Sequence, residues 1–187
     1  MKKNKMMNAV AIVFLLGLVL WGVYDYAQKG KDQAAGDSVL QNKEVGLNAG
    51  NIAPNFKLSK LDGEAVSLSD LKGKKVILNF WATWCPPCQM EMPHMEKIYK
   101  EYEKQGVVVL GVNLTFTEQD PAKVPVFVQD YGLSFPIALD KKGEVSDLYA
   151  VVGYPTTYII DSRGVISKRY QGAINYDIMR SALAGIQ

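Results

Sequence analysis

The two cysteines of the chain, Cys85 and Cys88, form a C-x-x-C motif that separates an apolar run from a helical pattern. The apolar run, residues 76–80 (VILNF), predicts a buried strand that leads into the motif. A helix N-terminus offers unpaired backbone N–H groups and the positive end of the helix dipole, and both stabilise a thiolate. The thiolate is the form that attacks a disulfide, and the second cysteine is close enough to displace the mixed disulfide. The arrangement therefore predicts a thioredoxin-like redox site.

Other uses of a cysteine pair fit this sequence less well. Zinc usually takes four ligands, whereas the motif supplies two and the only histidine is His94. An iron–sulfur cluster needs four cysteines, and covalent haem needs a histidine where this chain has Gln89. A purely structural disulfide gains little stability from closing so short a loop. We therefore expect a redox-active pair, with no metal and no other cofactor.

Two segments of the chain resemble one known group of proteins. Residues 79–88 (NFWATWCPPC) with Glu91-Met92-Pro93, and residues 153–161 (GYPTTYIID), are similar to the membrane-anchored thioredoxin-like proteins of the TlpA/ResA/StoA group. The resemblance covers the chain from about Gly46 onward. It implies an α/β thioredoxin-like fold and thiol–disulfide oxidoreductase activity. Tyr154 departs from the pattern, because many members have another residue there, often threonine; the departure concerns substrate choice and not the chemistry.

The N-terminal part of the sequence predicts a membrane anchor. Residues 9–24 are uncharged and almost wholly apolar, which is close to the ~17–25 residues that cross a bilayer. Lysines precede this run, so we expect the N-terminus to stay in the cytoplasm and the rest of the chain to lie outside. No A-x-A cleavage site follows the run. We therefore predict an uncleaved signal anchor over residues 1–26, with one transmembrane helix.

The remainder of the chain divides into a linker and one domain. Residues 27–49 contain glycines and scattered charges without periodicity, which predicts a flexible linker. Residues 50–187 carry strand and helix patterns in alternation, followed by a hairpin, which predicts an α/β thioredoxin-like sheet with an N-terminal β-hairpin extension. The expected elements are a hairpin of 56–58 and 65–67 around Asp62-Gly63, strands at 76–80, 107–114 and 135–139, a helix after Cys85 that kinks at Pro93, helices at 120–131, 144–149 and 176–186, and a hairpin of 156–160 and 165–170.

Cys85 is the candidate nucleophile, because it lies nearer the helix start and is expected to be the more exposed cysteine, and Cys88 is the candidate resolving cysteine. Glu91 lies three residues after Cys88 and so on the same helix face. It can be a solvated carboxylate or a proton acceptor for Cys88. The resemblance favours the second role, because thioredoxins proper carry a buried aspartate where this chain has Asn79, and an asparagine cannot titrate.

The expected substrate surface combines the C-x-x-C motif with the second segment of the resemblance, residues 153–161. The resemblance implies that Pro155 follows a cis peptide bond, which would expose the preceding backbone for strand-like pairing with a substrate. Tyr154 is then expected to lie against the sulfur of Cys85. The candidate substrate-binding residues are Trp84, Pro86, Pro87, Tyr154 and Pro155. Trp81 is expected to pack around the site, and His94 to be a surface side chain.

These features predict a membrane-tethered, extracytoplasmic reductant of protein disulfides. The resemblance implies a CcdA-type membrane protein as electron donor, and apocytochrome c or a spore-cortex enzyme as substrate. Two alternatives remain open, a peroxiredoxin-like peroxidase and a non-catalytic binding module. The first is disfavoured because Ala82 stands where peroxiredoxins have a threonine. The formal net charge is +2, and Lys2, Lys3 and Lys5 lie in the predicted anchor, so nothing indicates a nucleic-acid partner.

Overall fold

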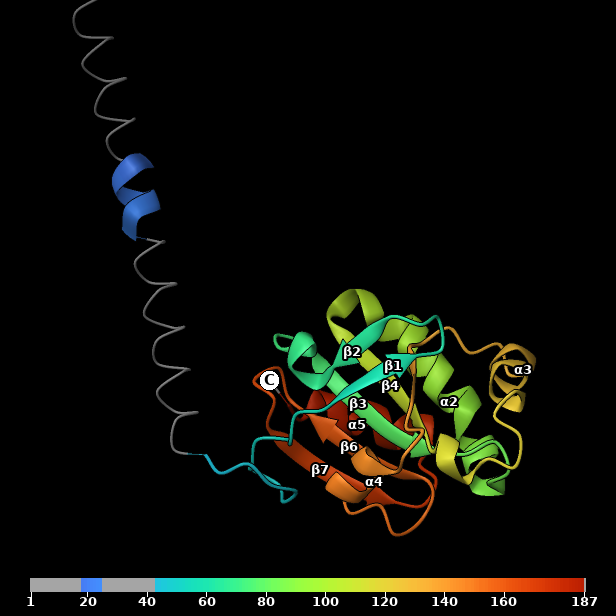
Figure 1. The fold of residues 1–187 in the computed structure, drawn as a ribbon. Coiled ribbons are helices and arrows are strands. Elements are labelled where there is room, and N and C mark those ends of the chain that lie inside the picture. The colour runs from blue at the N-terminus through green and yellow to red at the C-terminus, as the bar shows by residue number, and fades with distance from the viewer. Residues whose placement is uncertain (1–17, 25–42, 187) are drawn as a thin grey trace, which may run out of the picture. The chain divides into compact units, whose positions relative to one another are not determined.

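The computed structural model describes residues 18–24 and 43–186 (Figure 1). The chain divides into two compact units, residues 1–43 and 44–187. Within the first unit, residues 18–24 are helical and exposed. No helix among the described residues is both long and apolar enough to cross a membrane. Most of the predicted anchor (1–26) and linker (27–49) lies outside the described residues, so both stay predictions.

The second unit is built on one mixed sheet of seven strands in the order β2-β1-β5-β4-β3-β6-β7 (Figure 1). Strand β3 is parallel to β4, and β4 is parallel to β5, whereas every other neighbouring pair is antiparallel. The fold is thus the predicted α/β thioredoxin-like one, with the β1–β2 hairpin added at one edge. The strands are β1 Lys57–Lys60, β2 Ala65–Ser67, β3 Lys75–Trp81, β4 Val107–Asn113, β5 Ile137–Leu139, β6 Thr156–Ile160 and β7 Ile166–Gln171.

The helices of this unit divide between the two faces of the sheet. Helices α2, α3 and α5 contribute to one buried cluster, and α4 with the short 3-10 helix η1 contributes to the other. The helices are α2 Pro86–Tyr102, α3 Lys123–Asp130, α4 Glu144–Leu148 and α5 Tyr176–Ala184, and the 3-10 turns are η1 Leu68–Leu71, η2 Glu103–Gln105 and η3 Thr115–Thr117.

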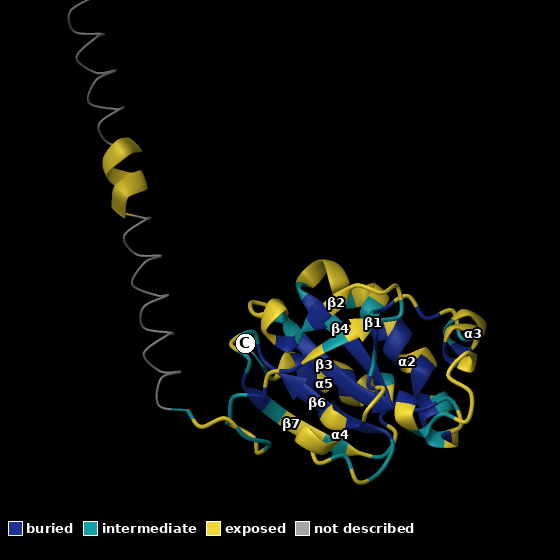
Figure 2. Ribbon diagram, in the orientation of Figure 1, coloured by how far each residue is buried: buried dark blue, intermediate teal, exposed yellow. Residues whose placement is uncertain are grey.

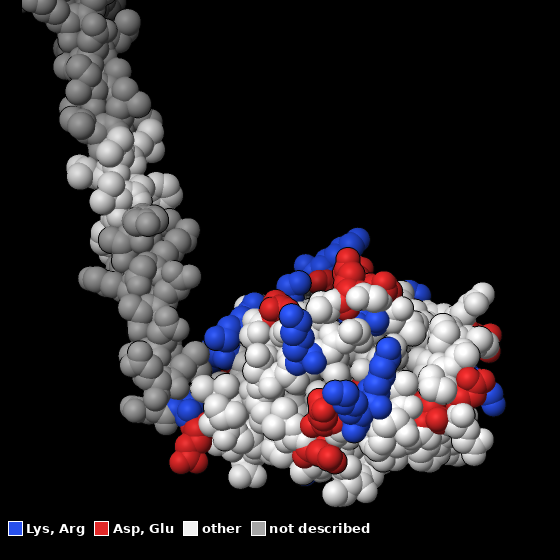
Figure 3. All heavy atoms as spheres, in the orientation of Figure 1, with Lys and Arg blue, Asp and Glu red and all other residues white. Residues whose placement is uncertain are grey.

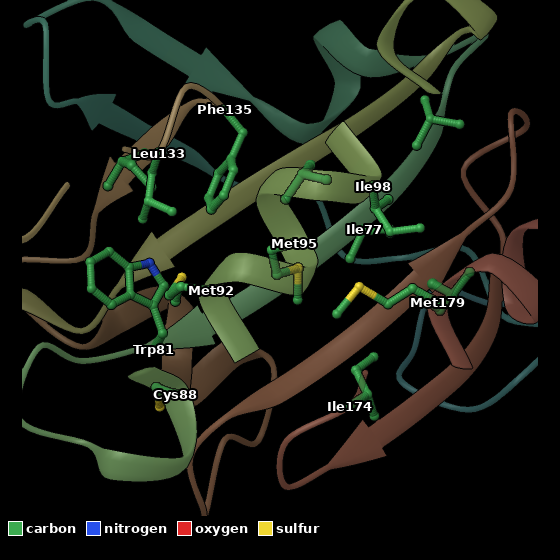
Figure 4. Packing of buried hydrophobic residues seen from close by; sticks show 14 of the residues in the cluster. Ile77, Trp81, Cys88, Met92, Met95, Ile98, Leu133, Phe135, Ile174 and Met179 are labelled. Carbon is green, nitrogen blue, oxygen red and sulfur yellow. The ribbon is translucent and has the colours of Figure 1, made fainter. Parts of the chain in front are cut away.

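Strand β3 lies between the two clusters because its side chains alternate between the faces of the sheet. Ile77 and Trp81 join the cluster under α2 and α5, whereas Val76, Leu78 and Phe80 join the cluster on the α4 side. The strand is buried almost throughout (Figure 2). Figure 4 shows Ile77 near Met95 of α2 and Met179 of α5, and Trp81 near Met92 of α2. This double-sided burial explains why the sequence shows a continuous apolar run rather than alternation.

Several element boundaries differ from those predicted. The helix expected from Asp120 begins at Lys123, because Asp120 closes a turn through its side chain, which accepts a hydrogen bond from the N–H of Ala122 over 3.0 Å. The strand expected from Phe135 begins at Ile137, and the closing helix ends at Ala184. Helix α2 continues through Pro93 as one element, and the kink there stays a prediction.

The domain already includes residues before position 50, where the sequence placed its start. The N–H of Ile52 donates to the carbonyl of Glu44 over 2.9 Å, and the N–H of Gly50 donates to Ile166 of β7 over 2.8 Å. These hydrogen bonds join the end of the expected linker to the edge strand of the sheet.

Candidate active site

The C-x-x-C motif lies where β3 ends and α2 begins. Cys85 is the N-cap residue of α2, and Pro86 and Pro87 occupy the first two helical positions. Proline suits this place, because the N–H that it lacks would have no partner within the helix. The backbone N–H of Cys88 points back to Cys85 and donates to its Sγ over 3.3 Å. The chain therefore folds locally into the geometry that the motif predicted, with the cysteine sulfur at the helix N-terminus.

The two cysteines are joined in a disulfide, with their Cα atoms 5.3 Å apart. The structure thus represents the oxidised form of the protein. Cys85 is 3% exposed and Cys88 is fully buried, so the difference in exposure is small and has the predicted sign. Figure 4 shows Cys88 near Trp81 and Met92, at the end of the cluster of buried residues. Of the two intervening prolines, Pro86 is exposed and Pro87 is half-buried.

The segment of residues 153–161 contacts the C-x-x-C segment through two aromatic side chains. Trp84, which is 49% exposed, packs edge-on against Tyr154 with the ring centroids 5.8 Å apart. The Tyr154–Pro155 peptide bond is cis, as the resemblance implied. Trp81 differs from Trp84, because it is fully buried and packs against Phe127. The fold therefore brings together Trp84 and Tyr154, two of the predicted substrate-binding residues, from segments about seventy positions apart in sequence.

Glu91 is fully buried, so it is not a solvated carboxylate, which was one of the two roles that the sequence left open. It lies one helical turn after Cys88, between α2 and the sheet. Its Oε2 accepts a hydrogen bond from Nδ2 of Asn79 over 3.2 Å, and its Oε1 accepts one from the N–H of Ile174 over 3.3 Å. Burial raises the pKa of Glu91 to about 8, and these hydrogen bonds oppose that rise. A carboxyl group with such a pKa exchanges its proton near neutral pH.

A second carboxylate, Glu118, lies beside the motif, and the sequence did not identify it. It accepts hydrogen bonds from Thr83, two residues before Cys85, and from Asn113 at the end of β4. The sequence feature that could have pointed to Glu118 is its position shortly after the end of β4. Parallel neighbours such as β3 and β4 end at the same edge of a sheet, so residues that follow them come together. His94, by contrast, is exposed on α2 as expected.

The surface around the domain carries charges of both signs. On the face shown in Figure 3, lysine and arginine side chains alternate with aspartate and glutamate, and neither sign forms one continuous patch. This distribution agrees with the small net charge of the sequence, +2.

Comparison with known proteins places the chain among thiol–disulfide oxidoreductases. The model of the AhpC/TSA family matches residues 49–169. The thioredoxin-like protein YneN of Bacillus subtilis is 43% identical over 180 residues, which cover 96% of this chain and 97% of that protein. The thiol-disulfide oxidoreductase ResA of Halalkalibacterium halodurans is 49% identical over 126 residues, which cover 67% of this chain and 70% of ResA.

The fold of a solved structure agrees with these relatives. The crystal structure of a putative thiol:disulfide interchange protein DsbE from Chlorobium tepidum superposes with a TM-score of 0.68 at 33% identity. The match covers 74% of this chain and 97% of the other. The sequence relatives and the structural relative are thus similar to this chain over the same domain that holds the C-x-x-C motif.

Proposed function

Because this chain belongs to the AhpC/TSA family, and within it to the ResA-like thioredoxin-family thiol–disulfide oxidoreductases, we propose that it reduces disulfide bonds in partner proteins outside the cytoplasm. The observation that carries the proposal is the Cys85–Cys88 disulfide at the N-cap of α2, with the Cys88 N–H directed at the sulfur of Cys85. In the reduced protein this N–H and the helix dipole favour the thiolate of Cys85.

The first step uses Cys85 as the nucleophile. Its thiolate attacks one sulfur of the substrate disulfide, and a mixed disulfide forms while the other substrate sulfur leaves as a thiolate. The substrate chain binds to a surface beside Cys85. This surface is formed by the aromatic pair Trp84 and Tyr154 together with Pro86, Pro87 and Pro155. Trp84 supports this role, because about half of its side chain faces solvent beside the motif.

The second step releases the reduced substrate. Cys88 loses its proton and attacks the sulfur of Cys85, so that the Cys85–Cys88 disulfide forms and the second substrate sulfur leaves. Two electrons pass in this way from the dithiol to the substrate. Cys88 is fully buried and needs a proton acceptor close by. Glu91 fits that role in its ionised form, because it is buried one turn further along α2 and its pKa of about 8 leaves a minor ionised fraction at neutral pH that grows to about half at pH 8.

The composition of the motif favours the reducing direction. Pro86 and Pro87 provide no N–H groups and no positive charge to the thiolate of Cys85. A less stabilised thiolate means a less stabilised dithiol, and the disulfide is then a weaker oxidant. Disulfides persist outside the cytosol, so a reductant there must receive electrons across the membrane. A CcdA-type membrane protein is the proposed donor, and apocytochrome c or a spore-cortex enzyme is the proposed substrate.

The localisation belongs to the same proposal. Residues 1–26 anchor the protein in the cell membrane, with the N-terminus in the cytoplasm and the catalytic domain on the extracytoplasmic side. The supporting observations are the lysines before the apolar run and the absence of a cleavage site in the sequence after it.

Trapping of partners tests the proposal. Cys88→Ala cannot complete the second step, so we expect it to accumulate mixed disulfides between Cys85 and its partners in cells. Cys85→Ser is the matched control and is expected to trap none. Trapping by Cys85→Ser alone would reverse the roles of the two cysteines. The purified wild-type dithiol should reduce insulin, whereas rapid peroxide consumption without insulin reduction would favour the peroxidase alternative, and neither activity would favour a binding module.

A further inference from the structure

The carboxylate of Glu118 binds three donors at the edge of the active site. Its Oε1 accepts hydrogen bonds from the backbone N–H of Thr83 and from Nδ2 of Asn113, each over 2.8 Å. Its Oε2 accepts a hydrogen bond from the hydroxyl of Thr83. Hydrogen bonds to an ionised carboxylate are stronger than those between neutral groups. Glu118 therefore joins the loop before Cys85 to the end of β4 through both of its oxygens.

The other polar groups of this loop are also bonded. The carbonyl of Thr83 accepts a hydrogen bond from Nε2 of Gln89 over 2.8 Å, so its N–H, carbonyl and hydroxyl all have partners. The indole N–H of Trp84 donates to the hydroxyl of Thr117 over 3.3 Å. The segment Thr83-Trp84 is thus held on one side by η3 and the residue that follows it, and on the other side by the first turns of α2.

Asn113, one of the three donors to Glu118, is itself held firmly in place at the end of β4. It is fully buried, and its Oδ1 accepts a hydrogen bond from the hydroxyl of Thr115 over 2.9 Å. It is also the last residue of β4, which pairs there with Trp81 of β3. Residues 82–84 make no ladder hydrogen bonds, and Glu118 ties this loop to the end of β4 through its hydrogen bonds to Thr83 and Asn113.

The orientation of Cys85 depends on this loop. Cys85 follows Trp84 directly and has the extended backbone of an N-cap residue, with φ −90° and ψ 106°. In this conformation its sulfur accepts the N–H of Cys88. Because Pro86 and Pro87 supply no N–H, the sulfur has few donors to replace that one if the loop turns away.

We propose that Glu118 is a positioning residue, whose carboxylate holds the Thr83-Trp84 segment and thereby keeps the sulfur of Cys85 at the helix N-terminus. This role rests on the proposed function, in which Cys85 is the nucleophile. Glu118 acts through Thr83 and not by contact with the substrate.

Two substitutions separate this role from a simple effect of charge. Glu118→Ala removes both the negative charge and the hydrogen bonds. Glu118→Gln removes only the charge, because the amide oxygen can accept from the Thr83 N–H and from Asn113, and the amide NH₂ can donate to the Thr83 hydroxyl after that hydroxyl rotates. Loss of a nearby negative charge would lower the thiol pKa in both variants. Loss of positioning would raise it in Glu118→Ala alone.

The measurement is the rate of alkylation of Cys85 by iodoacetamide as a function of pH, on the full-length protein in detergent with Cys88→Ala as background. For Glu118→Ala we expect a higher apparent pKa and a rate at pH 7 lowered roughly fivefold, because less of the sulfur is thiolate. For Glu118→Gln we expect a rate within about twofold of the parent protein. With Cys88 restored, the equilibrium with glutathione should shift toward the disulfide in Glu118→Ala only, because loss of thiolate stabilisation destabilises the dithiol.

An unchanged pH profile in Glu118→Ala would overturn the proposal, and so would a shift of the same sign and size in both variants. Circular dichroism checks that each variant is folded. If Glu118→Ala does not fold, Thr83→Val takes its place, because it removes only the hydroxyl that donates to Oε2, and a smaller shift in the same direction is expected. No shift in Thr83→Val would then overturn the proposal. Alkylation needs no protein substrate, so failure of the wild type to reduce insulin would count against the proposed function and not against this role of Glu118.

Discussion

Asn79 of β3 donates a hydrogen bond to the carboxylate of Glu91 on α2, with both side chains buried between the sheet and the helix. The same amide also donates to the hydroxyl of Thr157 on β6, over 2.9 Å. Asn79 is uncharged, so the hydrogen bonds to Glu91 offset only part of the cost of burying its negative form. The pKa of about 8 follows from this environment, and it has consequences for stability and for the cysteine chemistry.

The first prediction concerns the stability of the oxidised protein against pH. The pKa of Glu91 is about 8 in the folded state, against an ordinary value of 4.5. Between these values the folded state keeps a proton that the unfolded state has lost, so the free energy of unfolding falls as pH rises from 4.5 to about 8 and this contribution levels off above it. Glu91→Gln should remove the fall, a difference of roughly 3–5 kcal/mol across that range.

Urea unfolding at several pH values between 5 and 9 measures this difference. Glu144→Gln is the matched control, because Glu144 is an exposed carboxylate on α4, and it should follow the wild type. Parallel stability curves for Glu91→Gln and the wild type would show that the folded state does not hold the Glu91 proton.

The second prediction concerns the acidity of Cys85. Because the two prolines of the motif remove N–H donors, we expect its thiol pKa to lie near neutral or above, rather than far below the free value of ~8.5. Ultraviolet absorbance of the thiolate, recorded against pH in Cys88→Ala, gives this pKa. Equilibration of the intact pair with glutathione gives the potential. A pKa near ~4, or a potential as high as roughly −120 mV, would reverse the proposed direction of electron flow.

The third prediction concerns the effect of Glu91 on the same thiol. In its charged form Glu91 disfavours a second negative charge nearby, so Glu91→Gln should lower the apparent thiol pKa of the reduced protein. It should also slow the release of mixed disulfides, since Cys88 loses its proton acceptor. The thiolate titration measures the first effect, and single-turnover insulin reduction measures the second. If neither changes, the buried carboxylate has a structural role only.

The fourth prediction concerns partner choice. Tyr154 packs against Trp84 next to the motif, so Tyr154→Thr should change the set of proteins trapped by the Cys88→Ala variant more than it changes stability. Tyr176→Thr is the matched control, because Tyr176 lies on α5 and donates to Glu101. Mass spectrometry of the trapped complexes and thermal unfolding give the two readouts. An identical set of partners for Tyr154→Thr and its parent would contradict this role of the tyrosine.

The fifth prediction concerns membrane topology and rests on the sequence, because Ser38 lies outside the described residues. Ser38→Cys, in a background without the active-site cysteines, should react with a membrane-impermeant thiol reagent in intact cells. Lysines before the apolar run favour that orientation. Protection of this cysteine until the cells are lysed would place the domain on the cytoplasmic side.

The sequence alone determined the fold class and the place of the redox pair. The run of residues 76–80, the C-x-x-C motif and the helical pattern behind it are local signals, because strand burial, helix capping and cysteine spacing each involve neighbouring residues. The hairpin around Asp62-Gly63 is likewise local, and β1 and β2 confirm it. The cis bond before Pro155 was inferred from resemblance, since nothing in its neighbours requires it.

Only the tertiary structure decided the surroundings of the cysteines. The sequence left Glu91 either a solvated carboxylate or a proton acceptor for Cys88, because its burial depends on Asn79 of β3 and Ile174 before α5, which reach it from distant parts of the chain. The position of Glu118 shortly after β4 did not by itself identify it, because its partners, Thr83 and Asn113, follow or end two parallel strands that meet only in the sheet. Contacts between distant segments set the burial of a carboxylate, and burial sets its pKa, so these properties follow from packing and not from local pattern.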